Sequence, residues 1–160
     1  NTTNAAIDFL NWQLIFYPPG ETESRITTFA TSTGTTTIAG FGYFLLERTN
    51  DEPVKDINAG QIFRGAINDE GGILELRDSS GNLIDKVDFS TGWPAGEKEK
   101  RISMERAYSN ASSSDPQNWA NNNLITRNGR DADENKINGT PKAENSVSKT
   151  ETEIPETVAP

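Results

Sequence analysis

The sequence predicts an all-β sandwich with long loops and a disordered C-terminal tail. Short runs rich in apolar, β-branched and aromatic residues recur along the chain, with Gly, Pro, Asn and Ser clustered between them. Such spacing is typical of strands joined by turns in a two-layer β fold. No segment keeps helical periodicity over three turns. Apolar residues also thin out after Trp119, so the end of the chain has little to bury.

The first half of the chain contains four candidate strand regions. Residues 6–20, AIDFLNWQLIFYPPG, alternate roughly between apolar and polar, and the Pro-Pro-Gly end stops a strand. Residues 25–38, RITTFATSTGTTTI, are rich in Thr, whose β-branched side chain suits an exposed strand face. Residues 42–48, GYFLLER, predict a buried strand that ends in the turn-forming TNDEP. A short strand is expected around Ile62 and Phe63.

A β-hairpin is predicted next, from ILELRD at 73–78 and NLIDKVDF at 82–89. Gly81 lies between the two runs and takes the positive φ that a short hairpin loop needs. Residues 101–108, RISMERAY, predict a further strand, in which Met104 and Arg106 share one face.

The last part of the chain predicts one anchored loop and a tail. Trp119 lies in a polar neighbourhood, which indicates a single anchor that pins a loop onto the core. Residues 146–160, SVSKTETEIPETVAP, contain no aromatic residue and predict an extended linker. We therefore expect one domain over residues 1–145, followed by a Thr/Glu/Pro-rich tail over 146–160.

Composition excludes several functional classes. The chain has 160 residues, with 15 Lys and Arg against 24 Asp and Glu, a net charge of -9 and a pI near 4.5. A nucleic-acid partner is not expected, because phosphate binding needs basic patches. There is no Cys, hence no disulfide or thiolate metal site, and no His. No apolar run reaches the length of a membrane span. The chain starts without an initiator Met, so we expect a piece of a longer protein.

The chain resembles the lamin tail domain as it occurs in bacterial proteins. The resemblance rests on the order of GYFLLER, GGILELRDSSGNLIDKVDF, WPAG, SMER, a solitary Trp and NGTPKAEN, and it covers residues 1–145. It implies an immunoglobulin-like β-sandwich and a non-catalytic module, often attached to secreted or surface proteins in bacteria. The chromatin-linked role of nuclear lamins rests on basic surfaces, which this acidic chain does not predict.

The chain departs from this family pattern at its N-terminal end. Bacterial members usually open with one or two strands that end in a pattern like Glu-Trp-Ile-Glu-Leu-Tyr-Asn, and this opening is missing before NTTNAAIDFLNW. A sandwich that lacks a strand exposes unpaired backbone groups along an edge. Upstream strands could fill that edge, a neighbour could supply a strand, or the edge could be blunted.

RDADENKINGTP, residues 130–141, is the best candidate for a ligand site. Asp131, Asp133 and Asn135 occupy every second position, a spacing that lets an extended loop present oxygens to calcium, with Glu134 and a backbone carbonyl such as that of Ile137 as further donors. The loop is not an EF-hand, because Lys stands where that motif needs Gly and where it needs Glu. The alternative is a solvated acidic turn.

A second candidate is Trp93, followed by Pro94, Ala95 and Gly96. Its ring could form an aromatic platform for a sugar or a peptide. The alternative, which we favour, is that Trp93 closes one end of the sandwich while Pro94 and Gly96 set a turn.

No catalytic constellation is predicted. Asp85 and Asp88 invite comparison with the paired carboxylates of glycosidases, but alternation puts them on opposite faces of a strand. Asp85 is expected to make a structural hydrogen bond to a loop, and Arg106 to pair with a carboxylate at the sandwich rim. Ser103 has no His to activate it.

The sequence therefore predicts a non-catalytic binding or spacer module of a larger exported or cell-surface bacterial protein. It would act through protein–protein or edge-strand contacts, with other protein domains or another copy of itself as partners, and without membrane insertion. The alternative is a calcium- or carbohydrate-binding module that uses the Asp131–Asn135 loop. No cofactor is expected, apart from calcium in that alternative.

Overall fold

The computed structural model describes residues 1–149. This part of the chain forms β-strands and one short 3₁₀ helix, and no helix in it is long and apolar enough to cross a membrane. The elements are β1 (Ile7–Asp8), β2 (Gln13–Tyr17), β3 (Arg25–Thr28), β4 (Thr37–Ile38), β5 (Leu46–Arg48), β6 (Gln61–Phe63), β7 (Gly72–Arg77), β8 (Leu83–Phe89), β9 (Met104–Arg106), η1 (Pro116–Asn118) and β10 (Trp119–Asn121).

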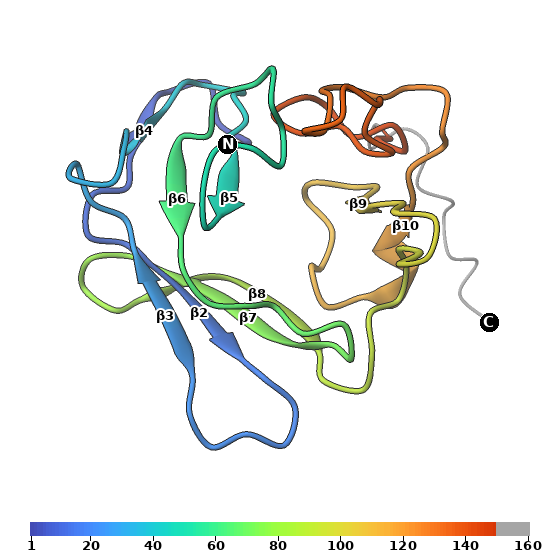
Figure 1. Ribbon diagram of the computed structural model, residues 1–160. Helices are drawn as coiled ribbons and strands as arrows, with labels where there is room; N and C mark the ends of the chain where they lie inside the picture. The colour runs from blue at the N-terminus through green and yellow to red at the C-terminus, as the bar shows by residue number, and fades with distance from the viewer. Residues whose placement is uncertain (150–160) are drawn as a thin grey trace.

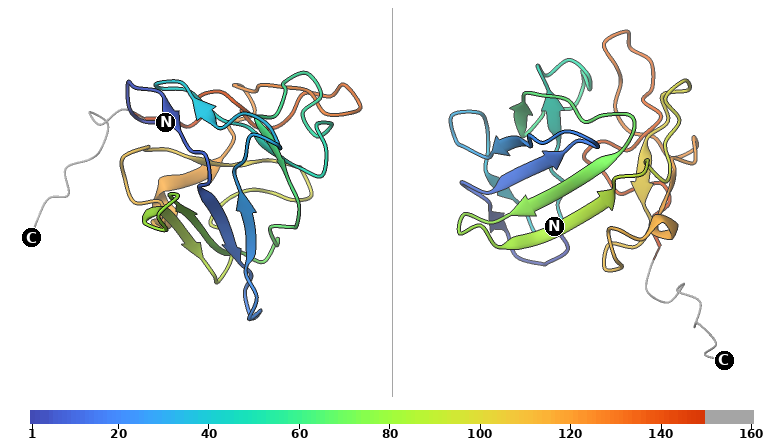
Figure 2. Two further views of the ribbon diagram at one scale, coloured as in Figure 1. Left: turned by 90° about the vertical axis from the view of Figure 1, so that its left-hand side faces the viewer. Right: turned by 90° about the horizontal axis from the view of Figure 1, so that it is seen from below.

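The largest sheet is four-stranded, with the order β3-β2-β7-β8 and antiparallel pairing throughout. Its centre is the pairing of β2 with β7, in which Leu14 faces Leu76 and Phe16 faces Leu74. Figure 2 (right) looks onto this sheet, and in Figure 1 it lies in the lower part of the view. The predicted strand regions 6–20 and 73–78 therefore supply its two middle strands.

The predicted hairpin of β7 and β8 is confirmed, and its turn is built from local hydrogen bonds. Gly81 has a φ of 86°, as expected for the loop. The Asp78 carboxylate accepts hydrogen bonds from the amides of Ser80 and Asn82, both at 2.9 Å. Beyond the turn the register shifts between Leu76 and Arg77, so that Ile84 has no partner in the ladder. Such a β-bulge bends the strand that carries it.

Shorter strand pairs form the rest of the fold: β5 with β6, β9 with β10, and β1 with β4. In Figure 1, β5–β6 and β9–β10 lie above the four-stranded sheet. The pair β5–β6 is parallel, whereas β1–β4 and β9–β10 are antiparallel. The predicted all-β sandwich with long loops is thus confirmed, although the strand expected over residues 42–48 is confined to Leu46–Arg48 and that over 101–108 to Met104–Arg106.

Aromatic side chains join the parts of the fold. Phe89, at the end of β8, is buried and makes edge-to-face contacts with Trp93 at 6.3 Å and with Trp119 at 6.1 Å between ring centroids. Trp119 also donates a hydrogen bond from Nε1 to the carbonyl of Ser113 at 2.9 Å. It therefore pins the 109–115 loop onto the core, as predicted.

A buried amide holds the loop between β3 and β4. Gln61 is 2% exposed, and its Nε2 donates to the carbonyls of Ala30 and Thr35, at 3.1 and 2.9 Å. Its Oε1 accepts from the Thr33 hydroxyl at 2.7 Å. The chain from Ala30 to Thr35 turns around the Gln61 side chain. The strand in the Thr-rich region therefore ends at Thr28.

The ordered domain extends past the predicted boundary at Asn145. The Lys149 amide donates to the carbonyl of Ala107 at 2.9 Å, and the Ser146 amide donates to Glu105 at 2.8 Å. Residues 146–149, the first part of the predicted tail, thus contact β9 and the residue that follows it. The remainder of the predicted tail, residues 150–160, lies outside the described residues.

Candidate functional site

An apolar groove with a volume of about 630 Å³ opens into the sandwich. It is large enough for a binding site, since ligand pockets commonly measure roughly 300–1,000 Å³. Its lining is mainly aromatic and aliphatic, and it comes from the first 44 residues, from β7 and β8, and from β9 and the loop that follows it. The lining residues are Asn1, Thr2, Thr3, Ile7, Phe9, Trp12, Phe29, Ile38, Phe44, Leu76, Ile84, Asp85, Arg106 and Ser109.

Three phenylalanine rings form one wall of the groove. Phe9 contacts Phe29 at 4.9 Å and Phe44 at 4.8 Å between centroids, both edge to face, and Phe29 and Phe44 lie 6.1 Å apart. Phe9 and Phe29 are buried, whereas Phe44 is only partly buried. Because aromatic rings packed in this way hold one another in place, the wall is preformed.

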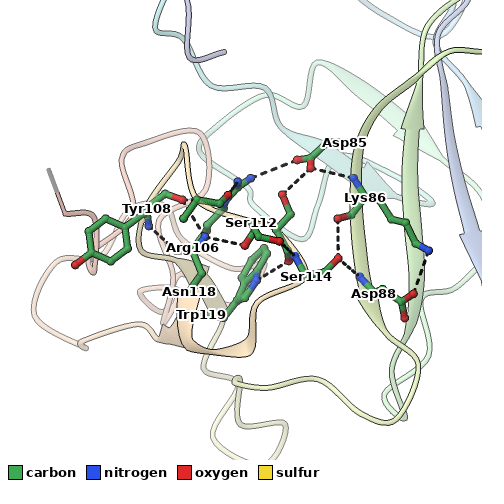
Figure 3. A network of polar contacts seen from close by, with 11 residues as sticks. Asp85, Lys86, Asp88, Arg106, Tyr108, Ser112, Ser114, Asn118 and Trp119 are labelled. Carbon is green, nitrogen blue, oxygen red and sulfur yellow. Dashed lines mark hydrogen bonds and ion pairs between the residues drawn. The ribbon is translucent and has the colours of Figure 1, made fainter. Parts of the chain in front are cut away.

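An ion pair between Asp85 of β8 and Arg106 of β9 also lines the groove. Arg106 Nη1 lies 3.3 Å from Asp85 Oδ2, and the Ser113 hydroxyl donates to Asp85 Oδ1 at 2.6 Å (Figure 3). Arg106 also donates to the carbonyls of Tyr108 and Ala111. Both predictions for these residues are confirmed: Asp85 binds a loop, and Arg106 pairs with a carboxylate at the rim.

The outer edge of β8 is partly capped by side chains. The Ser114 hydroxyl donates to the Lys86 carbonyl at 3.0 Å and accepts from the Asp88 amide at 3.0 Å. The Lys86 amide donates to Asp85 Oδ1 at 2.9 Å, and Lys86 Nζ pairs with Asp88 (Figure 3). A loop thus satisfies backbone groups that a neighbouring strand would otherwise pair, which blunts this part of the edge. Asp88 and Asp85 both act structurally.

Glu105 is a buried carboxylate that the sequence did not single out. It is 3% exposed and lies at the centre of β9. Its Oε1 accepts from Asn122 Nδ2 at 2.8 Å and from the Thr140 hydroxyl at 2.9 Å. Its Oε2 accepts from the Ser146 amide at 2.8 Å and the Ser146 hydroxyl at 2.6 Å. Burial favours the neutral form, but the hydrogen bonds from Ser146, Asn122 and Thr140 outweigh it and lower the pKa of Glu105.

Glu47, in β5, is the opposite case. It is 4% exposed, and neither carboxylate oxygen has a hydrogen-bond partner among residues 1–149. Burial, then the negative charges of Asp51 and Glu52, raise the pKa of Glu47. The nearby Val54 amide lowers the pKa of Glu47 by a smaller amount, although it does not reach hydrogen-bonding geometry. The ionised form is therefore costly in the folded protein.

In the predicted calcium loop, the Asp131 carboxylate accepts hydrogen bonds from the loop itself. Asp131 Oδ1 accepts from the amides of Asn135 and Asp133 at 2.9 and 3.0 Å, and these bonds, led by that of Asn135, lower the pKa of Asp131. Glu134 turns away and binds Lys55. Within residues 1–149 no three acidic side chains come together in a way that could hold a metal ion. The geometry is that of the alternative, an acidic turn, and a calcium site at Asp131, Asp133 and Asn135 stays a prediction without geometric support.

Trp93 has the packing role that we favoured. Its indole Nε1 donates to the carbonyl of Asn68 at 2.7 Å, and its ring packs on Phe89. The ring is therefore held partly buried against the end of the four-stranded sheet, and it does not line the groove. A platform for a sugar or peptide at Trp93 also stays a prediction.

The sequence indicated neither the groove nor the Glu105 cluster as a site. No family model, no curated protein and no solved structure matches the chain. The resemblance to the lamin tail domain thus stays a prediction that rests on the residues alone.

The Glu105 cluster predicts acid-sensitive stability. Glu105→Gln should lower the free energy of unfolding at pH 7 by about 2–3 kcal/mol, because an amide NH₂ would replace one acceptor and leave a donor such as the Ser146 amide unpaired. Folding lowers the pKa of Glu105 from its ordinary value of 4.5. The ionised carboxylate therefore stabilises the folded protein in full above pH 4.5, and this contribution disappears as the pH falls through the lowered pKa. Urea unfolding from pH 7 to pH 3 should show the variant losing less stability than the parent. The exposed Glu99→Gln is the control, and equal effects of both variants would contradict the cluster's role.

For Glu47 we predict a change in stability of the opposite sign. Glu47→Gln should raise the free energy of unfolding at pH 7 by about 1 kcal/mol, because it removes a buried charge without a partner. Because the pKa of Glu47 is raised in the folded state, the ionised carboxylate destabilises the parent protein in full at pH values above that pKa. This destabilisation decreases as the pH falls toward 4.5, the ordinary pKa of a Glu side chain. The gain should therefore vanish in acid. Thermal unfolding at several pH values measures it, with exposed Glu23→Gln as the control, and a destabilised variant at pH 7 would refute this account.

Proposed function

We propose that the chain is a non-catalytic protein-binding module of a larger exported or cell-surface bacterial protein, and that the groove is its binding site. The observation that carries the proposal is the groove itself: about 630 Å³ of mainly apolar space opens between the layers of the fold. Concave, mainly apolar spaces of this size are the usual form of binding sites in proteins. The exported or surface location rests on the resemblance to the lamin tail domain alone.

Several features favour binding over catalysis. The sequence has neither His nor Cys. The charged side chains in the groove lining, Asp85 and Arg106, pair with each other and hold a loop, so neither is presented as a free acid or base. Such a site fixes a partner by shape and apolar contact.

Binding of a neutral apolar dye tests the proposal. Nile red should bind in the groove with a stoichiometry near one and increased fluorescence. Ile84→Asn should weaken this binding by about tenfold, because it removes an isoleucine side chain from the contact surface. Ile26→Asn is the matched control: Ile84 is 49% and Ile26 is 55% exposed, both lie on edge strands of the same sheet, and only Ile84 lines the groove. Absent or non-saturable binding, or equal effects of the two variants, would refute the groove as a binding site.

A further inference from the structure

We infer that the partner bound in the groove is an extended polypeptide segment that is neutral or basic, carries apolar side chains at alternate positions, and adds a strand at the groove rim. This inference rests on the groove being the binding site proposed above. Three observations support the inference: the strand edges at the rim of the groove, the apolar wall of the groove, and the net charge of the whole chain.

Two strands that meet at the groove each have a side without a strand partner. β1 and β8 contribute Ile7 and Ile84 to the lining, and within residues 1–149 each of these strands is hydrogen-bonded to a single neighbouring strand. The third strand at the groove, β9, is covered on its second side, because Asn145 Nδ2 donates to the carbonyl of Arg106 at 3.0 Å. On β8 the Ser114 cap covers the backbone of Lys86 and Asp88 but does not extend to Ile84. Ile84 is half exposed and lies at the bulge, without a partner in the ladder. An incoming strand satisfies such edges by main-chain hydrogen bonds, which a small apolar ligand cannot make.

The apolar wall determines the pattern of side chains. In an extended segment, successive side chains point to opposite faces, so residues at every second position would face Phe9, Phe44 and the other apolar residues of the lining. The remaining side chains would point to solvent. The matching segment therefore alternates between apolar and polar residues.

Charge determines which polar residues suit the segment. The charged side chains of the groove lining are those of Asp85 and Arg106, which pair with each other, so the lining has no negative surplus of its own. The whole chain carries a net charge of -9, and its field attracts a basic segment and repels an acidic one. A second copy of the chain would bring the same negative charge, which disfavours it as the occupant.

Three synthetic nine-residue peptides test the inference: one of alternating Lys and Val, one of alternating Glu and Val, and the Lys peptide with N-methyl groups on one backbone edge. Fluorescence anisotropy of the labelled peptides measures binding to the full chain. The Lys peptide should bind about tenfold more tightly than the Glu peptide at low salt, and high salt should reduce this preference. N-methylation should weaken binding by about tenfold, since backbone donors are removed.

The two asparagine variants locate the peptide. Ile84→Asn should weaken binding of the Lys peptide and Ile26→Asn should not; neither substitution changes the charge. If Nile red binds as proposed but no peptide does, or if N-methylation has no effect, the strand-addition inference is wrong while the groove remains a binding site. If light scattering shows a dimer that Ile84→Asn dissociates, the occupant is a second copy and the inference is also wrong.

Discussion

A single buried carboxylate organises the C-terminal third of this protein. After β9 the described chain contains only a three-residue 3₁₀ helix and the three-residue strand β10 as regular structure. Glu105 replaces much of the missing backbone pairing, because its two oxygens bind Asn122, Thr140 and Ser146, which come from three separate segments. A fully satisfied polar network in a low-dielectric environment specifies one arrangement of the chain. The loops after β9 can therefore be long and still ordered.

The same arrangement fixes one side of the groove. Arg106 follows Glu105 in β9, so the strand that buries the carboxylate also presents the guanidinium that binds Asp85 on β8. Trp119, which pairs with Arg106 in the β9–β10 register, packs on Phe89 at the end of β8. The four-stranded sheet and the C-terminal loops are thus joined at the rim, while the space beside them stays open. A rigid frame around an apolar groove reduces the conformational entropy that the protein itself loses on binding a partner.

Features set by neighbouring residues could be predicted from the sequence. The β7–β8 hairpin follows from two strand-forming runs and from Asp78 and Gly81, which build the turn from local bonds. Trp119 was identified as an anchor because it is an isolated aromatic residue among polar neighbours. Alternation also placed Glu105 on the opposite face from Met104 and Arg106, but alternation does not say which face is buried, and a charged residue usually faces water.

Features built from distant segments could not be predicted in this way. The parallel pairing of β5 with β6 and the groove both depend on which segments meet in space. The donors of the shorter hydrogen bonds to Glu105 are spread from Asn122 to Ser146, so no local motif reveals them. The Asp131 loop shows the reverse problem: the spacing of Asp131, Asp133 and Asn135 fits a cation site, but the loop's own amides are the partners of Asp131. Local spacing alone does not separate these two outcomes.

Amide hydrogen exchange tests the organising role of Glu105 most directly. The amides of Ser146, which donates to Glu105, and of Asn123, which donates to the Ser146 hydroxyl, both lie outside regular structure. At neutral pH they should exchange as slowly as the amides of the β9–β10 pair, because one hydrogen-bonded cluster holds them all. Exchange of these two amides at the rate of an unstructured peptide, with β9–β10 still protected, would show that the C-terminal loops are not held by the carboxylate and would contradict the account.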